Sequence, residues 1–376
     1  MENSSDYMRL CLVQAAMARP LCSPNPAVGA IIVGPDGETA GVGHTQHRGG
    51  PHAEIMALRD AETRGRSVKG ATIYVSLEPC SHHGHTGPCA EALIRAGIAK
   101  VVASSLDPNP LVSGNGFAQL RDAGIEVVVG AGASETRELN IGFFSRMIRK
   151  RPWVRMKIAA STDGKTALEN GTSQWITSEA ARKDGHAWRA RSTAILTGIG
   201  TILKDDPRLD VRLANPTLQP QLVVVDSHLS TPLNARIFHA QRKVLIYTAE
   251  GNDEKKMALE KNGAVVVRLP IHRDGLRTQV DLTAMLTDLA RREINELHVE
   301  SGPKLNGSLI QGNLVDEFLF YLAPKLLGSG LPMATMGPFN ELSQAIEFEF
   351  LSSDLIGPDL RLLARIPGND SFQPAH

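Results

Sequence analysis

The chain lacks several features that would place it in other classes of protein. Of its 376 residues only four are cysteines, Cys11, Cys22, Cys80 and Cys89, too few for the disulfide framework of a secreted protein. It has no apolar run of about 18 residues, so no transmembrane helix is expected. The N-terminus is acidic and polar before any apolar stretch, which argues against a signal peptide. We therefore expect a cytoplasmic protein with reduced cysteines.

The chain also lacks an excess of either charge. Lys and Arg together number 40, as do Asp and Glu, and the two signs balance again within residues 1–150. A nucleic-acid-binding domain usually carries an excess of Lys and Arg. We therefore expect a small-molecule substrate, with neither nucleic acid nor membrane as a partner. We also expect a homo-oligomer.

Helix and strand patterns alternate along the whole chain, which is typical of α/β folds. Residues 27–46 form a β-hairpin pattern, and a helical pattern begins at His52. A later helical segment starts at Glu135 and is ended by Pro152. We interpret the basic residues around that proline as a solvated hinge rather than a phosphate site. At about 150 residues per domain the length suggests two domains, and we place the boundary between residues 148 and 149.

The second half contains its own set of strand patterns, which indicates an independent α/β domain. Strands are predicted over 153–161, 194–198, 221–226, 243–248, 264–269, 296–301, 317–322 and 360–366. Helices are predicted between several of them, notably over 178–192 and 281–293.

Two cysteines and three histidines lie close together in the segment E-P-C-S-H-H-G-H-T-G-P-C over 78–89. Upstream, His52-Ala53-Glu54 supplies the H-x-E motif of zinc deaminases, in which the Glu moves protons and is not a ligand. Cys80 and Cys89 correspond to the cysteines of the P-C-x-x-C motif, although eight residues separate them instead of two. A purely structural zinc site would have no use for Glu54. The set predicts a catalytic zinc and hydrolysis at an amino-substituted heterocycle.

Two other interpretations of this segment stay open on the residues alone. The two cysteines could be ordinary core residues. Alternatively, His82, His83 or His85 could replace one cysteine as a metal ligand.

The motifs of the first half resemble those of one enzyme family. S-P-N-P-A-V-G-A over 23–30, G-x-G-H-T over 41–45, G-P-H-A-E over 50–54 and the segment over 78–89 are similar to the deaminase half of the bifunctional riboflavin-biosynthesis deaminase/reductases. The long segment between the cysteines separates that family from cytidine and tRNA adenosine deaminases. This chain has G-P-C where the family more often has P-P-C.

The resemblance implies a cytidine-deaminase-like three-layer domain over 1–148, a zinc-dependent pyrimidine deaminase. By this resemblance His52, Cys80 and Cys89 hold zinc, and Glu54 is the general acid and base. Asn25 and His44 would line the pyrimidine pocket. The alternatives are a turn-forming role for Asn25 and a surface position for His44. The three histidines at 82, 83 and 85 would belong to a loop near the substrate.

The second half carries weaker motifs when its residues are considered alone. Gly198-Ile199-Gly200 follows a strand, but the third glycine of a dinucleotide fingerprint is missing. E-S-G-P-K-L-N-G-S-L over 300–309 leads from a strand into a helix, and its glycines would let a pyrophosphate approach the helix N-terminus. The alternative is a plain strand-to-helix turn.

Further motifs of the second half match the reductase half of the same family. They are S-T-D-G-K-T-A over 161–167, S-Q-W-I-T over 173–177, R-A-R-S-T-A-I-L-T-G over 189–198, T-I-L-K-D-D-P-R-L-D-V-R over 201–212, V-V-D-S over 224–227 and V-E-S-G-P over 299–303. This half is similar to dihydrofolate reductase in fold, which accounts for the missing fingerprint. The two sets of motifs together cover most of residues 20–310. The resemblance implies an NADPH-dependent reductase domain over 149–376.

The same resemblance assigns binding residues in this domain. NADPH would contact Ala159, Trp175, Thr201, Asp205, Ser227, Gly302, Pro303, Lys304, Leu305, Asn306, Gly307 and Ser308. The phosphorylated substrate would contact Ser173, Arg189, Leu209, Arg212 and Glu300, and Lys157 is a candidate for holding the ribose. Trp175 could instead be a core residue, and each arginine considered alone could be a surface charge.

The resemblance implies two consecutive reactions. The first is hydrolytic deamination of a 2,5-diamino-6-ribosylaminopyrimidinone phosphate with Zn2+. The second is reduction of the ribosyl side chain by NADPH, which gives the ribitylaminouracil phosphate of riboflavin biosynthesis.

Overall fold

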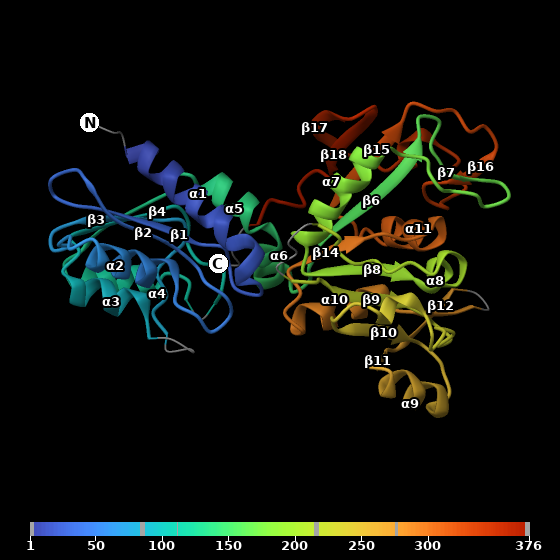
Figure 1. The fold of residues 1–376 in the computed structure, drawn as a ribbon, viewed down its shortest axis with the longest axis horizontal. Coiled ribbons are helices and arrows are strands. Elements are labelled where there is room, and N and C mark those ends of the chain that lie inside the picture. The colour runs from blue at the N-terminus through green and yellow to red at the C-terminus, as the bar shows by residue number, and fades with distance from the viewer. Residues whose placement is uncertain (1–3, 83–86, 111, 214–217, 275–276, 373–376) are drawn as a thin grey trace. The chain divides into compact units, whose positions relative to one another are not determined.

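The computed structural model describes residues 4–82, 87–110, 112–213, 218–274 and 277–372 (Figure 1). The described chain divides into two compact units, one up to Arg149 together with Phe372, the other from Lys150 to Ser371. The division falls one residue after the expected boundary. Phe372 belongs to the first unit, where it packs on the ring of Phe144 and the guanidinium of Arg149.

The first unit is a five-stranded sheet between two layers of helices. Its elements are α1 (Ser4–Cys22), β1 (Gly29–Val33), β2 (Thr39–His44), α2 (Ala53–Thr63), β3 (Thr72–Val75), α3 (Cys89–Ala96), β4 (Lys100–Ala103), α4 (Asn115–Asp122), β5 (Glu126–Val129), α5 (Ala133–Leu139) and α6 (Ile141–Arg149). The strand order is β2-β1-β3-β4-β5; β1 is antiparallel to β2 and β3, and β3, β4 and β5 are parallel. Helices α1 and α5 cover one face, and α2, α3 and α4 cover the other (Figure 1). The expected three-layer arrangement is confirmed.

Two glycines in this sheet allow helices to approach its backbone. A Cβ on Gly43 would lie 2.3 Å from the carbonyl oxygen of Ala53, at the start of α2. A Cβ on Gly29 would lie 2.0 Å from the carbonyl oxygen of Cys11 in α1, on the opposite face. The first turn of α2 is therefore held directly against β2. This turn carries Glu54, and His52 is its N-cap.

Two features of the first unit differ from the sequence prediction. Helix α1 was not predicted, although Met8, Cys11, Ala15 and Ala18 recur at helical spacing and are buried. The helix expected from Glu135 onwards is two helices, α5 and α6. They are separated at Asn140, whose side chain bonds both the N–H and the carbonyl oxygen of Ala27 (2.7 and 3.0 Å).

The second unit is built on a nine-stranded sheet. Its elements are β6 (Trp153–Ser161), β7 (Lys165–Leu168), α7 (Glu179–Ala190), β8 (Ala194–Gly198), α8 (Ile199–Asp205), β9 (Gln221–Val225), η1 (Arg236–Phe238), β10 (Val244–Thr248), α9 (Asp253–Lys261), β11 (Ala264–Arg268), β12 (Ile271–Asp274), β13 (Arg277–Val280), α10 (Leu282–Arg291), β14 (Glu296–Val299), α11 (Pro303–Gln311), β15 (Glu317–Ala323), β16 (Gly330–Pro332), η2 (Leu342–Gln344), β17 (Glu349–Ile356) and β18 (Asp359–Arg365). The strand order is β11-β10-β9-β8-β14-β6-β15-β18-β17. The first seven strands in this order, from β11 at the edge to β15, run parallel, and β18 and β17 follow as antiparallel strands.

Helices cover both faces of this sheet. Apolar residues of α10 and α11 pack with one face of β6, β14 and β10 in a single core. On the opposite face, α8 and α9 pack on β8, β9 and β10, and α7 packs on β15. The predicted α/β class is confirmed here too, but α8, α9, β7, β12, β13, β16 and β17 were not predicted as elements. Across the described ranges, every helix is too short or too polar to cross a bilayer.

Candidate functional site

The side chains of the H-x-E and P-C motifs meet at one end of the first sheet. Strands β2, β3 and β4 all point toward this end, and β1 starts there. The segment after β3 carries Cys80, while the N-termini of α2 and α3 bring His52 and Cys89. Residues that are 28 and 37 positions apart in the sequence therefore converge.

His52, Cys80 and Cys89 place three ligand atoms within 4.8 Å of one another. The Sγ atoms of Cys80 and Cys89 lie 3.5 and 3.4 Å from Nδ1 of His52. Tetrahedral zinc with one nitrogen and two sulfur ligands needs such atoms roughly 3.6 Å apart. One imidazole and two thiols are also donors that zinc prefers. These three residues fit a zinc ion and leave a fourth position for a reacting molecule.

Hydrogen bonds in this cluster favour the thiolate form of Cys80, which is the form that binds a metal. The pKa of Cys80 is lowered because Cys89 and His52 donate hydrogen bonds to its sulfur. The backbone N–H of Cys89 points at the same sulfur, 3.4 Å away. The hydrogen bond to Cys80 raises the pKa of His52 to about 9. A metal ion would replace the protons shared by these groups.

The carboxyl group of Glu54 lies beside the three ligands and is only 3% exposed. Burial, and then the charge of Cys80, raise its pKa to about 7. A carboxyl group with such a pKa can both accept and release a proton near neutral pH. This is the property that a general acid and base requires.

The E-P-C segment is anchored by Glu78, whose carboxylate accepts hydrogen bonds from four backbone N–H groups. The donors are Asp107 (3.3 Å), Gly114 (2.9 Å), Gly116 (2.9 Å) and Phe117 (3.3 Å). A Cβ on Gly116 would lie 2.0 Å from the carbonyl oxygen of Pro79, so α4 packs directly on the residue before Cys80. The glutamate of the motif therefore fixes the loop that carries the ligand.

Asp107 was not predicted as a site residue, yet it is buried at this same end of the sheet, after β4. Burial raises its pKa to about 7, and the charges of Glu78 and Cys80 act in the same direction while His52 opposes them. Its position after a strand parallel to β3 is the signal that could have identified it, because the ends of parallel strands meet at one edge.

The structure gives positions, but no ligand contacts, for the other predicted residues of the first unit. Asn25 is half-buried between α1 and β1, and His44 ends β2 with Nδ1 3.4 Å from Oε1 of Gln14. Both positions are at the same end of the sheet as His52, Cys80 and Cys89. Among the candidate loop histidines, His82 is exposed, and His83 and His85 lie outside the described residues. Roles for all of these residues stay predictions.

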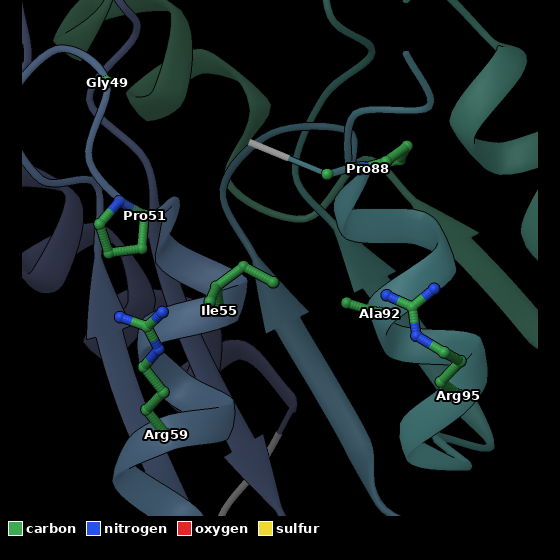
Figure 2. A pocket seen from close by; sticks show the side chains of 8 residues that line it. Gly49, Pro51, Ile55, Arg59, Pro88, Ala92 and Arg95 are labelled. Atoms are coloured by element: carbon green, nitrogen blue, oxygen red, sulfur yellow. The ribbon is translucent and has the colours of Figure 1, made fainter. Parts of the chain in front are cut away.

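A pocket of about 420 Å3 lies between α2 and α3 (Figure 2). Pro51 and Pro88, which directly precede His52 and Cys89, line one end of it. Arg59 and Arg95 line it from opposite sides. None of the three ligands is among the described residues that line it. The pocket therefore adjoins the cluster of His52, Cys80 and Cys89 without containing it.

In the second unit, Glu300 is the centre of a cluster of charged side chains. Arg189 on α7 donates to both of its carboxylate oxygens (2.5 and 2.8 Å), and Nζ of Lys157 on β6 lies 4.0 Å away. Arg189 holds the pKa of Glu300 well below its usual range in spite of burial. Burial lowers the pKa of Lys157, with Arg189 acting in the same direction and Glu300 against it.

The loop over 206–212 is rich in arginine contacts. Arg208 and Arg212 belong to it, and Arg189 and Arg242 donate hydrogen bonds to its backbone. Asp210 pairs with Arg208 (2.7 Å) and Arg212 (2.5 Å), and its carbonyl oxygen accepts from Arg189 (3.0 Å). Arg242 donates to the carbonyl oxygens of Arg208 and Leu209.

The cations around this loop outnumber the carboxylates with which they pair. Burial lowers the pKa of Arg242 to about 10, and the charges of Arg189 and Arg208 add to this effect although Asp210 opposes it. The backbone of Leu209 has a φ of +50°, in the region that favours glycine, so this loop has an unusual conformation that its contacts must maintain. An anion such as a phosphate would complement the local charge.

Some of the residues predicted to bind a dinucleotide lie at the carboxyl ends of β8 and β14. A Cβ on Gly302 would point at Oγ1 of Thr201, 4.0 Å away, and one on Gly198 at the side chain of Leu305. Ser227 follows the adjacent strand β9, and its carbonyl oxygen accepts from the N–H of Glu250 (2.8 Å). The other residues of the predicted set lie on nearby elements. Ala159 is on β6, and Asp205 is the exposed last residue of α8. Pro303, Lys304 and Ser308 belong to α11.

Two of these predicted residues contact the protein's own chain. The side chain of Asn306 is buried and donates to the carbonyl oxygen of Met333 (2.8 Å). A Cβ on Gly307 would lie 1.9 Å from the carbonyl oxygen of Thr335, so packing alone requires a glycine there. Whether either residue also contacts a cofactor stays a prediction.

Trp175 is 64% exposed, so it is not a core residue. The guanidinium of Arg182 lies 4.3 Å from its ring centroid, and Lys325 donates to the carbonyl oxygens of Trp175 and Ile176 (3.1 and 2.8 Å). Ser173 is half-buried in the same segment. An exposed aromatic ring stacked on a guanidinium, with its backbone fixed by a lysine, is suited to ligand contact.

Two family profiles match the chain. The one described as "RibD C-terminal domain" matches residues 152–362, and "Cytidine and deoxycytidylate deaminase zinc-binding region" matches residues 1–105. The riboflavin biosynthesis protein RibD of Escherichia coli is 42% identical over 365 residues, covering 95% of this chain and 97% of that protein. That of Aquifex aeolicus is 39% identical over 359 residues, with 96% and 97% covered.

Solved structures agree with these matches. Acinetobacter baumannii RibD superposes with a TM-score of 0.86 at 36% identity, covering 96% of this chain and 98% of that one. A Thermotoga maritima protein described as a diaminohydroxyphosphoribosylaminopyrimidine deaminase/5-amino-6-(5-phosphoribosylamino)uracil reductase gives 0.84 at 31% identity, with 96% and 98% covered.

Proposed function

This chain belongs to the RibD family of riboflavin biosynthesis proteins, and from that premise we propose how its residues perform the two activities. It is a bifunctional enzyme that joins a deaminase with a zinc-binding region to a reductase. We assign the deaminase to residues 1–148 and the reductase to 149–376. We further assign it the substrates that the name of the Thermotoga maritima relative states, first the diaminopyrimidine ribosyl phosphate and then the aminouracil ribosyl phosphate.

The observation that carries the deaminase assignment is the convergence of His52, Cys80 and Cys89 beside the buried carboxyl group of Glu54. Zinc held there supplies Lewis acidity and brings the pKa of water down to about 7. Glu54 accepts the proton of the attacking water and delivers it to the departing ammonia. Asn25 and His44 are proposed to orient the pyrimidine, and Asp107 is close enough to the ligands to influence the same site electrostatically.

Replacing Glu54 with Gln tests this assignment, because the amide keeps the shape of the side chain but cannot move a proton. We expect ammonia release to fall by roughly two orders of magnitude or more, the usual contribution of a general acid or base. Zinc content and NADPH oxidation on deaminated substrate should stay at wild-type levels. Unchanged ammonia release would show that Glu54 has no part in the reaction and would contradict the assignment.

For the second step we propose that the substrate phosphate binds at the arginines around the 206–212 loop. Arg212 and Arg189 contact it, together with Ser173 and the backbone of Leu209. The excess of positive charge at this loop supports the assignment, because a phosphate dianion would neutralise it.

NADPH is proposed to bind along the carboxyl ends of β8 and β14, where Thr201 and Gly302 adjoin. NADPH supplies the hydride for C1′ of the ribosyl group, and the C1′–O4′ bond breaks as the ribityl chain forms. The oxygen O4′ then needs a proton. The Lys157 ammonium is suited to donate it, because burial lowers its pKa and Glu300 keeps it oriented.

We also propose that the enzyme is a cytoplasmic homo-oligomer. Two thiol ligands favour a reducing compartment. Strand β17 is the last strand of the nine-stranded sheet, and Phe350, Leu351 and Leu355 on it are 62%, 47% and 76% exposed. Long apolar edge strands are usually covered by a partner. A second copy of the chain is the partner proposed here.

A further inference from the structure

The imidazole of His298 is buried in the second unit and has no part in the site as described so far. It is 0% exposed, and neither ring nitrogen makes a hydrogen bond of acceptable geometry with the described residues. Buried polar groups in folded proteins are nearly always hydrogen bonded. A histidine in this position therefore calls for a physical reason.

The neighbours of His298 connect it to the reductase cluster. Glu296, His298 and Glu300 alternate along β14 and its continuation, so their side chains share one face of the sheet. Nε2 of His298 lies 3.4 Å from Oε1 of Glu300. Arg155, the residue beside His298 on β6, is already paired with Glu296 (2.8 Å) and Glu317 (2.9 Å). Oε1 of Glu300 is therefore the acceptor available to an N–H on Nε2 of His298.

The imidazole is neutral in this environment. Burial lowers the pKa of His298, and the charges of Arg155 and Arg189 act in the same direction although Glu300 opposes them. A neutral imidazole has a single N–H. Leaving a buried N–H without an acceptor is costly, so the proton belongs on Nε2, the nitrogen that faces Glu300.

We propose that His298 is a positioning residue of the reductase site, which holds Oε1 of Glu300 through its Nε2–H. Groups from three elements then surround the carboxylate: Arg189 on α7 donates hydrogen bonds to it, the Lys157 ammonium on β6 lies 4.0 Å away, and the Nε2–H of His298 on β14 is directed at Oε1. Without the imidazole, Glu300 would be free to turn toward Arg189 alone and away from Lys157. The inference rests on the proposed reductase function, in which Lys157 must be aimed at the sugar.

Three substitutions separate positioning from packing. His298→Gln keeps an N–H near the place of Nε2, His298→Asn keeps one near the place of Nδ1, and His298→Leu keeps neither. We expect Leu and Asn to lower the reductase kcat roughly tenfold or more, the size of one lost hydrogen bond to a charged group. Gln should restore kcat to within about threefold of wild type, and the KM for NADPH should change less than about twofold in all three.

The measurement is NADPH oxidation on the deaminated substrate by the full chain. Ammonia release from the diaminopyrimidine substrate, assayed separately on the same preparations, is the control and should not change. Leu297→Val is the matched structural control, since Leu297 is buried on the opposite face of the same strand. It should lower the melting temperature without the kcat pattern. Should His298→Leu not fold, the Gln and Asn pair decides the question.

The results distinguish failure of the His298 inference from failure of the proposed reductase function. If Gln lost as much activity as Asn, or if all three variants kept the wild-type kcat, His298 would be a packing residue and the inference would be wrong. If the wild-type enzyme itself did not oxidise NADPH on this substrate, the proposed reductase function would fail instead.

Discussion

At the scale of single residues, the ligand set is the most consequential assignment. His52→Ala should remove zinc and ammonia release together, because it leaves two of three ligands. His82→Ala should keep the zinc content at wild-type level and change ammonia release far less, since His82 is exposed. Metal analysis of the purified variants distinguishes the two. Loss of zinc from His82→Ala would reinstate a loop histidine as a ligand.

The phosphate contact is also testable residue by residue. Arg212→Ala should raise the KM for the phosphorylated substrate roughly tenfold or more, the cost of a lost hydrogen bond to a charged group. The KM for NADPH should stay nearly constant, because Arg212 pairs with Asp210 in the 206–212 loop and is not among the residues proposed to bind NADPH. Arg292→Ala, which breaks a surface pair with Asp288 on α10, serves as control. Equal increases in both KM values would contradict the assignment.

What the sequence could predict of the site depends on whether the residues belong to a contiguous motif. His52 and Glu54 are two positions apart, and Cys80 follows a recognisable strand, so their pattern alone indicated zinc chemistry. Asp107, Arg242 and His298 carry no such pattern. Each acquires its place from the packing of elements that are distant in sequence. Only the folded chain brings Asp107 to the His52 and Cys80 cluster, Arg242 to the 206–212 loop and His298 to Glu300.

At the scale of elements, close packing of α4 on the E-P-C segment supports the metal centre. Gly116→Ala should destabilise the first unit by about 1–3 kcal/mol, the usual cost of overpacking, and weaken zinc binding, because its Cβ would meet the carbonyl oxygen of Pro79. Gly185→Ala in α7 meets nothing within 4 Å and should be neutral or stabilising. Thermal unfolding with and without a chelator compares the two. Equal stability of the variants would show that α4 can shift freely.

The elements themselves were predictable to different degrees. Strands such as β8 and β10 are short apolar runs buried on both faces, and the sequence placed them almost to the residue. Strand β17 escaped prediction because nearly all its residues are exposed and its apolar side chains follow no alternation. Helices α8 and α9 were not predicted because they are short and each buries a single residue, Ile202 and Leu259.

At the scale of the whole molecule, the apolar edge at β17 predicts an oligomer. Leu355→Lys should shift the enzyme toward the monomer in light scattering after size exclusion, because a buried lysine without a partner is costly. Val265→Lys is the matched control, since Val265 is 42% exposed on β11, the opposite edge of the same sheet. A monomeric wild type, or the same oligomer in both variants, would exclude β17 as the interface.

The central claim is that one chain carries out two separable reactions, the first dependent on the site of His52, Cys80 and Cys89. The most direct measurement follows ammonia release and NADPH oxidation together on the diaminopyrimidine ribosyl phosphate, before and after removal of the metal. We predict that both signals appear with the zinc-loaded enzyme, and that both stop after chelation. Adding deaminated substrate to the chelated enzyme should restore NADPH oxidation alone. Ammonia release that persists without metal, or NADPH oxidation that deaminated substrate cannot restore, would contradict the account.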